Sequence, residues 1–408
     1  MKKVVFTICA KNYLAQALTL KESCLKHNKD VDFQIFLADK VEEENILKES
    51  LVLLDESWIS YWKQMAFKYN VIEFSTSVKP FCFNKLFKEG YDKVIYLDPD
   101  IYVTDSLDTI FGYLDQKSIV LSPHYCHIQE NYTGSVPEEE LLFVGIYNLG
   151  FCAIKNGLIG KKIIKWWMNR LEDKCYADKI DALHVDQRWM DFIPAFFPND
   201  TYITQHPGIN PAIWNLHERE LLIYENKYYI KDLVTKQEFP LLFFHFSGFD
   251  PFNEKVLNRR HPKYNTDIFP SYIPLIKEYI KAEYRNGYEL YSKMIYSFNA
   301  FNDGENIMPI HRRLFRIIND STVEDPFQQN SNFRNILKKN KLLSNRKTYA
   351  FSSLSSVEKK KKGKVESTMK GTFFLLKKIV GIRFYSSFIS FLGQFVRFEN
   401  QTFLIKKK

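Results

Sequence analysis

Residues 93–103 read KVIYLDPDIYV, an apolar and β-branched run that passes into two carboxylates two positions apart. Such a run is typical of a buried parallel strand, in which both faces of the sheet are covered. Pro99 has no N–H to donate to a ladder, so regular strand pairing is expected to stop there. Because an unpaired carboxylate is costly to bury, Asp98 and Asp100 either reach solvent in a turn or hold one hard cation together. The stretch by itself leaves both interpretations open.

Strands and helices are predicted to alternate around this run. Besides the opening run, the predicted strands are residues 3–8, 32–39, 71–74 and 118–122, and the predicted helices are residues 14–27, 42–54, 81–88 and 158–171. This alternation predicts an α/β domain with a mostly parallel sheet. Ligands of such sheets gather at the carboxyl ends of strands, where residues 9–13, Asp39, Asp98 and Asp100 fall. Neither GxxxxGK[ST] nor GxGxxG occurs, which excludes P-loop and dinucleotide-binding proteins.

Composition indicates a folded, intracellular chain. Its 408 residues are 45% hydrophobic and 16% aromatic, which suits one large domain with an appendage. The six cysteines form no CxxC pair, so buried thiols are expected rather than disulfides or a zinc site. The apolar run after Lys2 and Lys3 is too short for a signal peptide and is expected to be a strand. We therefore expect a cytoplasmic protein.

The basic residues are concentrated near the end of the chain. The net charge is +9, but residues 331–408, which include the run Lys359–Lys362, carry 19 Lys and Arg against 3 Asp and Glu, so the first 330 residues have a net charge of −7. We expect a catalytic-sized domain at 1–265, a helical extension at 266–330, a basic polar linker at 331–368 and a basic amphipathic segment at 369–408.

The last segment is expected to lie on an anionic membrane surface, on the inner face of the cell membrane. Its longest uncharged span, Phe384–Val396, is shorter than the roughly 20 residues that a membrane-crossing helix needs. Basic residues alternate there with aromatic and aliphatic clusters, which favour lipid over nucleic acid. The alternative is that the segment packs on the body of the protein or forms an oligomer contact.

Four motifs occur in a fixed order. The chain reads YLDPD at 96–100, NLGF at 148–151, VDQ at 185–187 and HFSG at 245–248. In this order, over about the first 250 residues, it resembles the nucleotide-sugar glycosyltransferases of the GT-A fold, most closely family 8. A lone DxD is a weak signal, whereas the ordered set is specific. The resemblance implies a Rossmann-like GT-A catalytic domain with a mostly parallel sheet, followed by a helical C-terminal extension.

The resemblance assigns Asp98, Asp100 and His245 to one divalent cation, Mn²⁺ or Mg²⁺. Carboxylate oxygens suit both ions, and Mn²⁺ also accepts imidazole. Such a cation neutralises the charge that develops on a departing nucleotide diphosphate. A single His on an apolar run is more often a satisfied core residue, but the HFSG context favours the ligand role. Gly248 is expected to let backbone N–H groups approach the diphosphate, or else to form a tight turn.

The resemblance also implies that Asn148, Asp186 and Gln187 contact the donor sugar, with Asp186 and Gln187 as the catalytic residues. Carboxylate and amide side chains are the groups that recognise sugar hydroxyls. The alternative for Asp186 is a helix N-cap. The implied reaction retains the anomeric configuration. Because Gln187 is a poor nucleophile, we expect the acceptor to attack on the same face that the phosphate leaves.

Two departures from the family pattern concern the donor. Ala10-Lys11 stands where the first strand commonly ends in an acid that reads uracil, which leaves Asn12 and Tyr13 as the candidates for contacting the base. The family's phosphate-binding lysine after HxxG is absent, because this chain continues as Phe249-Asp250-Pro251. Lys79 or Lys85 is expected to replace it, and each is equally compatible with a surface role.

The function expected from these residues is transfer of a sugar, as in a hexosyltransferase, from a nucleotide-sugar such as a UDP-hexose to a glycan or lipid-linked acceptor in surface polysaccharide synthesis. One alternative is an inverting transferase of the same fold. Another is a non-catalytic, membrane-associated scaffold. A sugar-nucleotide pyrophosphorylase is disfavoured, because no basic glycine-rich loop follows Ile8.

Overall fold

The computed structural model describes residues 1–41, 51–318, 325–343 and 356–405, and it divides into two compact units. Unit 1 comprises residues 1–65 and 71–296, and unit 2 comprises residues 66–70 and 297–408. The expected domain boundaries remain predictions, and each unit is described by itself.

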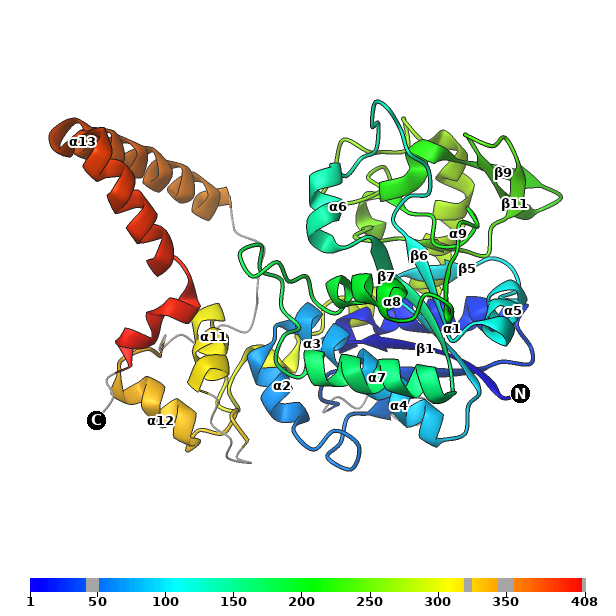
Figure 1. Cartoon of the computed structure of the whole chain (residues 1–408), viewed down its shortest axis with the longest axis horizontal. Coiled ribbons are helices and arrows are strands. Elements are labelled where there is room, and N and C mark those ends of the chain that lie inside the picture. Colours follow the sequence, from blue (N-terminus) through cyan, green and yellow to red (C-terminus); the bar gives the residue numbers. More distant parts are fainter. Residues whose placement is uncertain (42–50, 319–324, 344–355, 406–408) are drawn as a thin grey trace. The chain divides into compact units, whose positions relative to one another are not determined.

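Unit 1 is built on a seven-stranded sheet with the strand order β3-β2-β1-β4-β7-β6-β8 (Figure 1). Its strands are β1 (Lys3–Cys9), β2 (Asp32–Leu37), β3 (Leu51–Leu53), β4 (Lys93–Leu97), β6 (Ile119–Pro123), β7 (Tyr147–Lys155) and β8 (Thr201–Ile203). All neighbouring pairs are parallel except those that β7 makes with β4 and β6. The predicted α/β class with a mostly parallel sheet is therefore confirmed.

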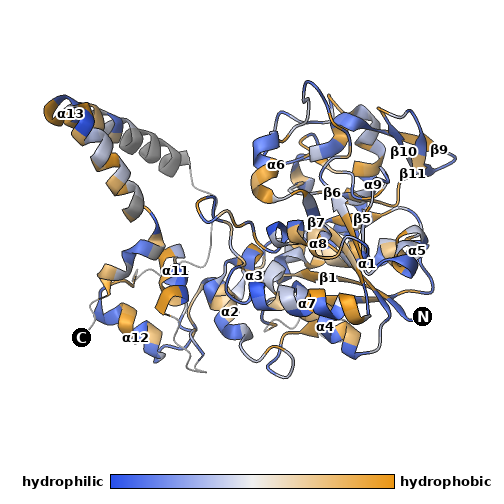
Figure 2. Cartoon of the chain, in the orientation of Figure 1, coloured by the Kyte–Doolittle hydropathy of each residue, from blue (hydrophilic) through white to orange (hydrophobic). Residues whose placement is uncertain are grey.

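Helices cover both faces of this sheet. The helices of unit 1 are α1 (Leu14–His27), α3 (Val71–Ser77), α4 (Lys79–Lys88), α5 (Asp108–Gln116), α6 (Glu138–Val144), α7 (Leu158–Leu171), α8 (Ile193–Phe196), α9 (Ile273–Arg285) and α10 (Tyr288–Tyr291), with a 3-10 turn η1 at Lys11–Tyr13. In β1, successive residues face opposite layers: Val5 packs in one core with Leu20 of α1, and Phe6 contacts Phe83 of α4. The apolar colouring of β1 reflects this burial on both sides (Figure 2).

Smaller sheets complete unit 1. The strands β9 (Arg219–Tyr224), β10 (Lys227–Asp232) and β11 (Glu238–Pro240) form an antiparallel sheet, and β5 (Ile101–Val103) pairs with β12 (Phe243–His245). The apolar run at 240–246 therefore returns to the strand that directly follows Asp100.

Two predicted elements are wrong. Residues 71–74 were expected to be a strand but begin helix α3, whose buried residues Glu73, Phe74 and Ser77 follow helical spacing while Ile72 is exposed. Within the helix expected at 42–54, residues 42–50 lie outside the described residues, and Leu51–Leu53 form the edge strand β3 beside β2.

Unit 2 is helical and contains α11 (Pro309–Ile318), α12 (Asn332–Lys339), α13 (Ser356–Phe395) and a terminal 3-10 segment η8 (Phe398–Leu404), whereas α2 (Trp62–Lys68) straddles the unit boundary. This confirms the helical C-terminal region. Its core is aromatic, because Phe67 contacts the rings of Phe301, Phe315, Phe327 and Phe333.

Part of the expected linker is structured. Residues 332–339 form α12 and bury Phe333 and Leu337, so this part is not a solvated coil, while residues 344–355 lie outside the described residues. Helix α13 is broken at Gly381 and alternates hydrophilic with hydrophobic residues (Figure 2). Among the residues that the structure describes, no helix combines the length and apolar character needed to cross a membrane.

Candidate functional site

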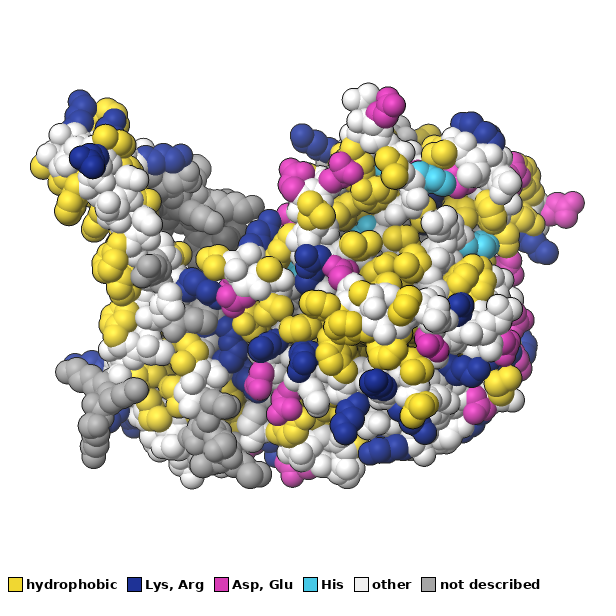
Figure 3. Space-filling view, in the orientation of Figure 1, with side chains coloured by type: hydrophobic (Ala, Val, Ile, Leu, Met, Phe, Trp, Pro, Cys, Tyr) yellow, Lys and Arg dark blue, Asp and Glu magenta, His cyan; other side chains and the backbone are white. Residues whose placement is uncertain are grey.

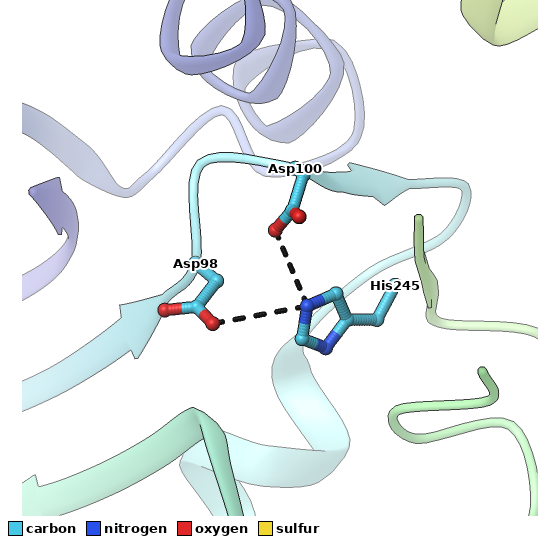
Figure 4. Close-up of side chains that lie close together, drawn as sticks. All are labelled: Asp98, Asp100 and His245. Atoms are coloured by element: carbon cyan, nitrogen blue, oxygen red, sulfur yellow. Dashed lines mark ion pairs between the residues drawn. The ribbon is translucent and has the colours of Figure 1, made fainter. Parts of the chain in front are cut away.

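Asp98, Asp100 and His245 converge where strands β4, β5 and β12 meet. Regular pairing of β4 ends at Leu97, and Asp98 then donates its N–H to the carbonyl of Gly150 at 2.7 Å. His245 is brought in by the antiparallel pairing of β12 with β5, which sets it opposite Ile101. Its Nε2 lies 3.2 Å from Oδ1 of Asp100 and 3.7 Å from Oδ2 of Asp98 (Figure 4). The three expected ligands thus face one another.

The electrostatics of this cluster suit a cation. Burial by itself lowers the pKa of His245, but the facing carboxylates of Asp100 and Asp98 raise it above its usual value. Burial raises the pKa of Asp98 despite the opposing charges of Lys79 and His245. At Asp100 burial also raises the pKa, but His245, a backbone hydrogen bond and the Arg260 charge together lower it below its usual value. Two oxygens and one imidazole nitrogen lie within 4.8 Å of one another, and this donor set fits a divalent ion such as Mn²⁺.

A hydrogen-bonded shell orients the histidine. Asn210 Oδ1 lies 3.2 Å from Nδ1 of His245, and Nδ2 of Asn210 donates to Oδ1 of Asn148 at 3.0 Å. The N–H of Gly150 donates to the same Asn148 oxygen at 3.1 Å. A Cβ at Gly150 would lie 2.4 Å from Cε1 of His245, so only glycine leaves room for the ring.

The cluster opens onto a cavity of about 490 Å³ at the carboxyl end of β1. Of the residues expected to bind the donor, Asn12, Tyr13 and Gly248 line it together with Asp98, Asp100 and His245. Gly248 has φ +67°, a conformation that strains other residues. The cavity is thus built from segments that lie far apart in the sequence.

Two arginines of this cavity were missed from the sequence. Arg259 and Arg260 line it, and neither guanidinium makes an ion pair or hydrogen bond with a residue that the structure describes. Their loop is held against the HFSG segment, since Arg259 N–H donates to the carbonyl of Gly248 at 3.0 Å and Asn258 donates to that of Ser247 at 2.5 Å. The paired arginines were the available signal, but nothing local showed that the loop folds back.

Lys79 and Asp186 form a buried ion pair. Their charged atoms lie 2.5 Å apart, and their side chains are only 1% and 2% exposed. Lys79 also donates to the carbonyl of Leu149 at 2.8 Å and lies 4.0 Å from the ring centre of Tyr96, whose hydroxyl donates to Asp98 at 2.5 Å. This network links α4 and the start of η3 (Gln187–Phe192) to the acidic cluster.

Three other residues that were expected to contact the nucleotide-sugar donor do not line the cavity. They make hydrogen bonds or ion pairs elsewhere in the protein. Gln187 accepts from the N–H of Leu149 and donates to the carbonyl of Val144, each at 2.9 Å. Lys85 pairs with Glu89 at 2.9 Å within α4. Asn148 is 9% exposed. None of them, nor Lys79 or Asp186, is among the residues that line the 490 Å³ cavity.

Comparison with known proteins gives distant similarities. No family model matches the chain. The uncharacterised protein YfnF of Bacillus subtilis (strain 168) is 23% identical over 278 residues, covering 66% of this chain and 88% of YfnF, and YfnD of the same strain is 24% identical over 190 residues, covering 46% and 57%.

Among solved structures, the galactosyltransferase LgtC in complex with donor and acceptor sugar analogues has a TM-score of 0.41 and 15% identity, covering 68% of this chain and 95% of LgtC. The apo glycosyltransferase GlyE of Streptococcus pneumoniae TIGR4 has a TM-score of 0.38 and 15% identity, covering 77% and 72%.

Proposed function

We propose that the protein is a metal-dependent glycosyltransferase of the GT-A type, which transfers a sugar from a nucleotide-sugar to a glycan or lipid-linked acceptor. The observation that carries the proposal is the convergence of Asp98, Asp100 and His245 on the wall of a cavity that also holds two arginines without partners among the described residues. A cation held by carboxylates and neighbouring guanidinium groups can both bind phosphate oxygens, so together they form a site for a polyanion such as a diphosphate.

Each side of the cavity has a distinct task in this proposal. Asp98, Asp100 and His245 would hold Mn²⁺ or Mg²⁺, and such a cation would neutralise the charge that develops on the diphosphate. Arg259 and Arg260 donate to the phosphate oxygens in place of Lys79 and Lys85, whose ammonium groups are engaged by Asp186 and Glu89. Asn12 and Tyr13 face the nucleoside, with the Tyr13 ring available for stacking on the base.

Asn148, Asp186 and Gln187 are proposed to support the site. Asn148 acts on His245 through Asn210, while Gln187 and the Lys79–Asp186 pair fix the start of β7 beside Asp98. The proposed transfer retains the anomeric configuration, as the family resemblance implies. Since none of the three is placed as a covalent nucleophile, we infer that the acceptor attacks on the face that the diphosphate leaves. The sugar is a hexose in this proposal.

The acceptor is proposed to lie at a membrane. The segment from Met369 onward exposes apolar side chains, among them Phe374, Ile379 and Ile382, between Lys377, Lys378 and Arg383. This composition suits peripheral binding to the anionic inner face of a cell membrane, where lipid-linked intermediates of surface polysaccharides are located.

The test is a screen of UDP-, GDP- and dTDP-sugars with Mn²⁺ for release of free nucleotide diphosphate. We expect release with one donor class, its loss on adding a chelator, and its loss in the double variant Asp98→Asn/Asp100→Asn. NMR analysis of the product anomer then separates retention from inversion. Two results together would establish the scaffold alternative. These are no turnover with any donor, and a double variant that still fulfils the protein's role in cells.

A further inference from the structure

Helix α7 presents one side to the protein and another to solvent. Its inner side packs through Ile163, Ile164, Trp167 and Leu171, which are buried at helical spacing. Gly160 allows this close approach, because a Cβ there would lie 2.0 Å from the carbonyl oxygen of Lys155. This packing fixes the rotation of α7 about its axis, and so determines which of its residues face solvent.

An aromatic group lies beside that outer side. It consists of Trp166 of α7 with Trp189, Phe192 and Phe196 of η3 and α8, and Trp166 meets the other three edge-on at 6.1, 6.4 and 5.9 Å between ring centres. Phe192 and Phe196 stack at 5.5 Å and are 49% and 53% exposed. Hydrophobic side chains gather over α7 and α8 in the space-filling view (Figure 3). Soluble proteins rarely expose clustered large aromatics without a partner.

The charged residues of α7 are all basic. The helix carries Lys161, Lys162, Lys165 and Arg170 and no Asp or Glu. No ion pair joins any of the four to a carboxylate in the described part of the chain. Lys162 lies 5.6 Å from the ring centre of Phe197 and Arg170 lies 5.8 Å from that of Trp166, so cations border the aromatic group. These four cations and the aromatic group are termed the α7 face.

The chemistry of the α7 face discriminates between partners. Lysine is depleted from the cores of protein interfaces, which disfavours a protein partner. A glycan would need open ring faces and neighbouring hydroxyl-binding groups, but Phe192 and Phe196 stack on each other and carry no polar atom. Exposed Phe and half-buried Trp bordered by unpaired Lys and Arg are the composition that binds the headgroup region of anionic bilayers.

We propose that the α7 face docks unit 1 on an anionic phospholipid surface. This is a second membrane contact, independent of the C-terminal segment and of whether the cavity transfers sugars. The aromatic group enters the headgroup region, and the four cations bind lipid phosphates.

Tryptophan quenching separates this contact from the C-terminal one, because residues 369–408 contain no tryptophan. The full chain is mixed with vesicles of brominated phosphatidylcholine and phosphatidylglycerol. We expect tryptophan fluorescence to be quenched on binding, and the quenching to be lost in Trp166→Phe/Trp189→Phe. Vesicles of phosphatidylcholine alone should bind far more weakly.

A charge variant provides the second measurement. Lys161→Gln/Lys162→Gln/Lys165→Gln should weaken binding to phosphatidylglycerol vesicles on the order of a hundredfold, at about 1 kcal/mol for each basic residue. The control Lys227→Gln/Lys236→Gln/Lys293→Gln changes three exposed lysines elsewhere on unit 1 and should bind as wild type. Unquenched tryptophans in vesicle-bound protein, or undiminished binding by the α7 variant with its circular dichroism intact, would overturn the proposal. So would equal binding to neutral vesicles.

Discussion

The side-chain oxygen of Asn210 lies 3.2 Å from Nδ1 of His245, while the other ring nitrogen faces Asp98 and Asp100. An amide oxygen accepts only, so this contact places a ring proton on Nδ1, and Nε2, which faces the carboxylates, is the nitrogen that a bound cation would use. Asn210 itself has φ +59°, a conformation that Asn tolerates and most residues do not. The backbone and side chain of Asn210 therefore both serve the orientation of His245.

Replacing Asn210 should weaken metal binding. Asn210→Gly accommodates the positive φ but removes the acceptor for Nδ1–H, and loss of such an outer contact costs about 10–100-fold in metal affinity. Asn210→Asp keeps the acceptor and should therefore bind Mn²⁺ more tightly than Asn210→Gly does. Titration calorimetry with Mn²⁺ measures both variants, and equal affinity of Asn210→Gly and wild type would contradict the role.

Gly150→Ala should displace His245. The added Cβ would meet the imidazole at 2.4 Å and Asn148 Oδ1 at 2.8 Å, and both neighbours are buried side chains with little freedom to move. We expect loss of Mn²⁺ binding and a stability loss of about 1–3 kcal/mol. Gly112→Ala in helix α5 is the matched control, because nothing lies within 4 Å of its Cβ. It should bind Mn²⁺ normally and be slightly more stable in urea unfolding.

Arg259→Ala should weaken the use of the nucleotide-sugar. Losing a charge-assisted hydrogen bond to phosphate costs about 1.5–3 kcal/mol, or about 10–100-fold in kcat/KM for donor hydrolysis. Arg259→Lys should fall between, because it keeps the charge without the guanidinium fork. Lys255→Ala, an exposed lysine of the same loop region, is the control. If Arg259→Ala and Lys255→Ala have the same kcat/KM as wild type, the diphosphate is held elsewhere.

Local patterns predicted the elements of the acidic cluster but not all of its surroundings. Asp98 and Asp100 follow a buried strand and His245 ends another apolar run, and the resemblance to GT-A glycosyltransferases is what assigns the three to one cation. The sequence did not predict Arg259 and Arg260 as cavity residues, because their position depends on a loop that is hydrogen-bonded to the carbonyl groups of Ser247 and Gly248. Residues 71–74 were misassigned, since four residues carry too little periodicity to separate a strand from the first turn of α3.

Burial explains the difference between expectation and structure at Lys79 and Asp186. The resemblance implies a contact with the donor for each of them, but it contains no information on their distance from each other. In the fold they lie 2.5 Å apart with almost no exposure. An interaction between α4 and the residue before η3 is a tertiary property, which local periodicity does not encode.

Lys79→Met should therefore reduce stability before it affects donor binding. It leaves Asp186 as an unpaired buried carboxylate, and breaking such a pair costs about 3–5 kcal/mol. The double variant Lys79→Met/Asp186→Leu removes both charges and should recover much of this loss. Urea unfolding of the single and double variants measures the difference. Unchanged stability of Lys79→Met with a raised KM for the donor would instead favour direct contact with the diphosphate.

Glu283 of α9 should make unit 1 less stable as pH rises. Its side chain is 1% exposed, and burial raises the pKa of its carboxyl from 4.5 to about 8, with the Asp100 and Asp250 charges adding to this and a hydrogen bond from Tyr279 opposing it. The folded protein therefore keeps the proton between pH 4.5 and about 8, while the unfolded chain releases it. The contribution of this group to the free energy of unfolding is largest below pH 4.5 and declines toward pH 8 by about 1.4 kcal/mol per pH unit.

Glu283→Gln should remove that decline, as measured by urea unfolding with chelator present. Glu289→Gln, on the exposed side of α10, should retain it, and parallel pH profiles for Glu283→Gln and wild type would show that Glu283 is ionised in the folded state.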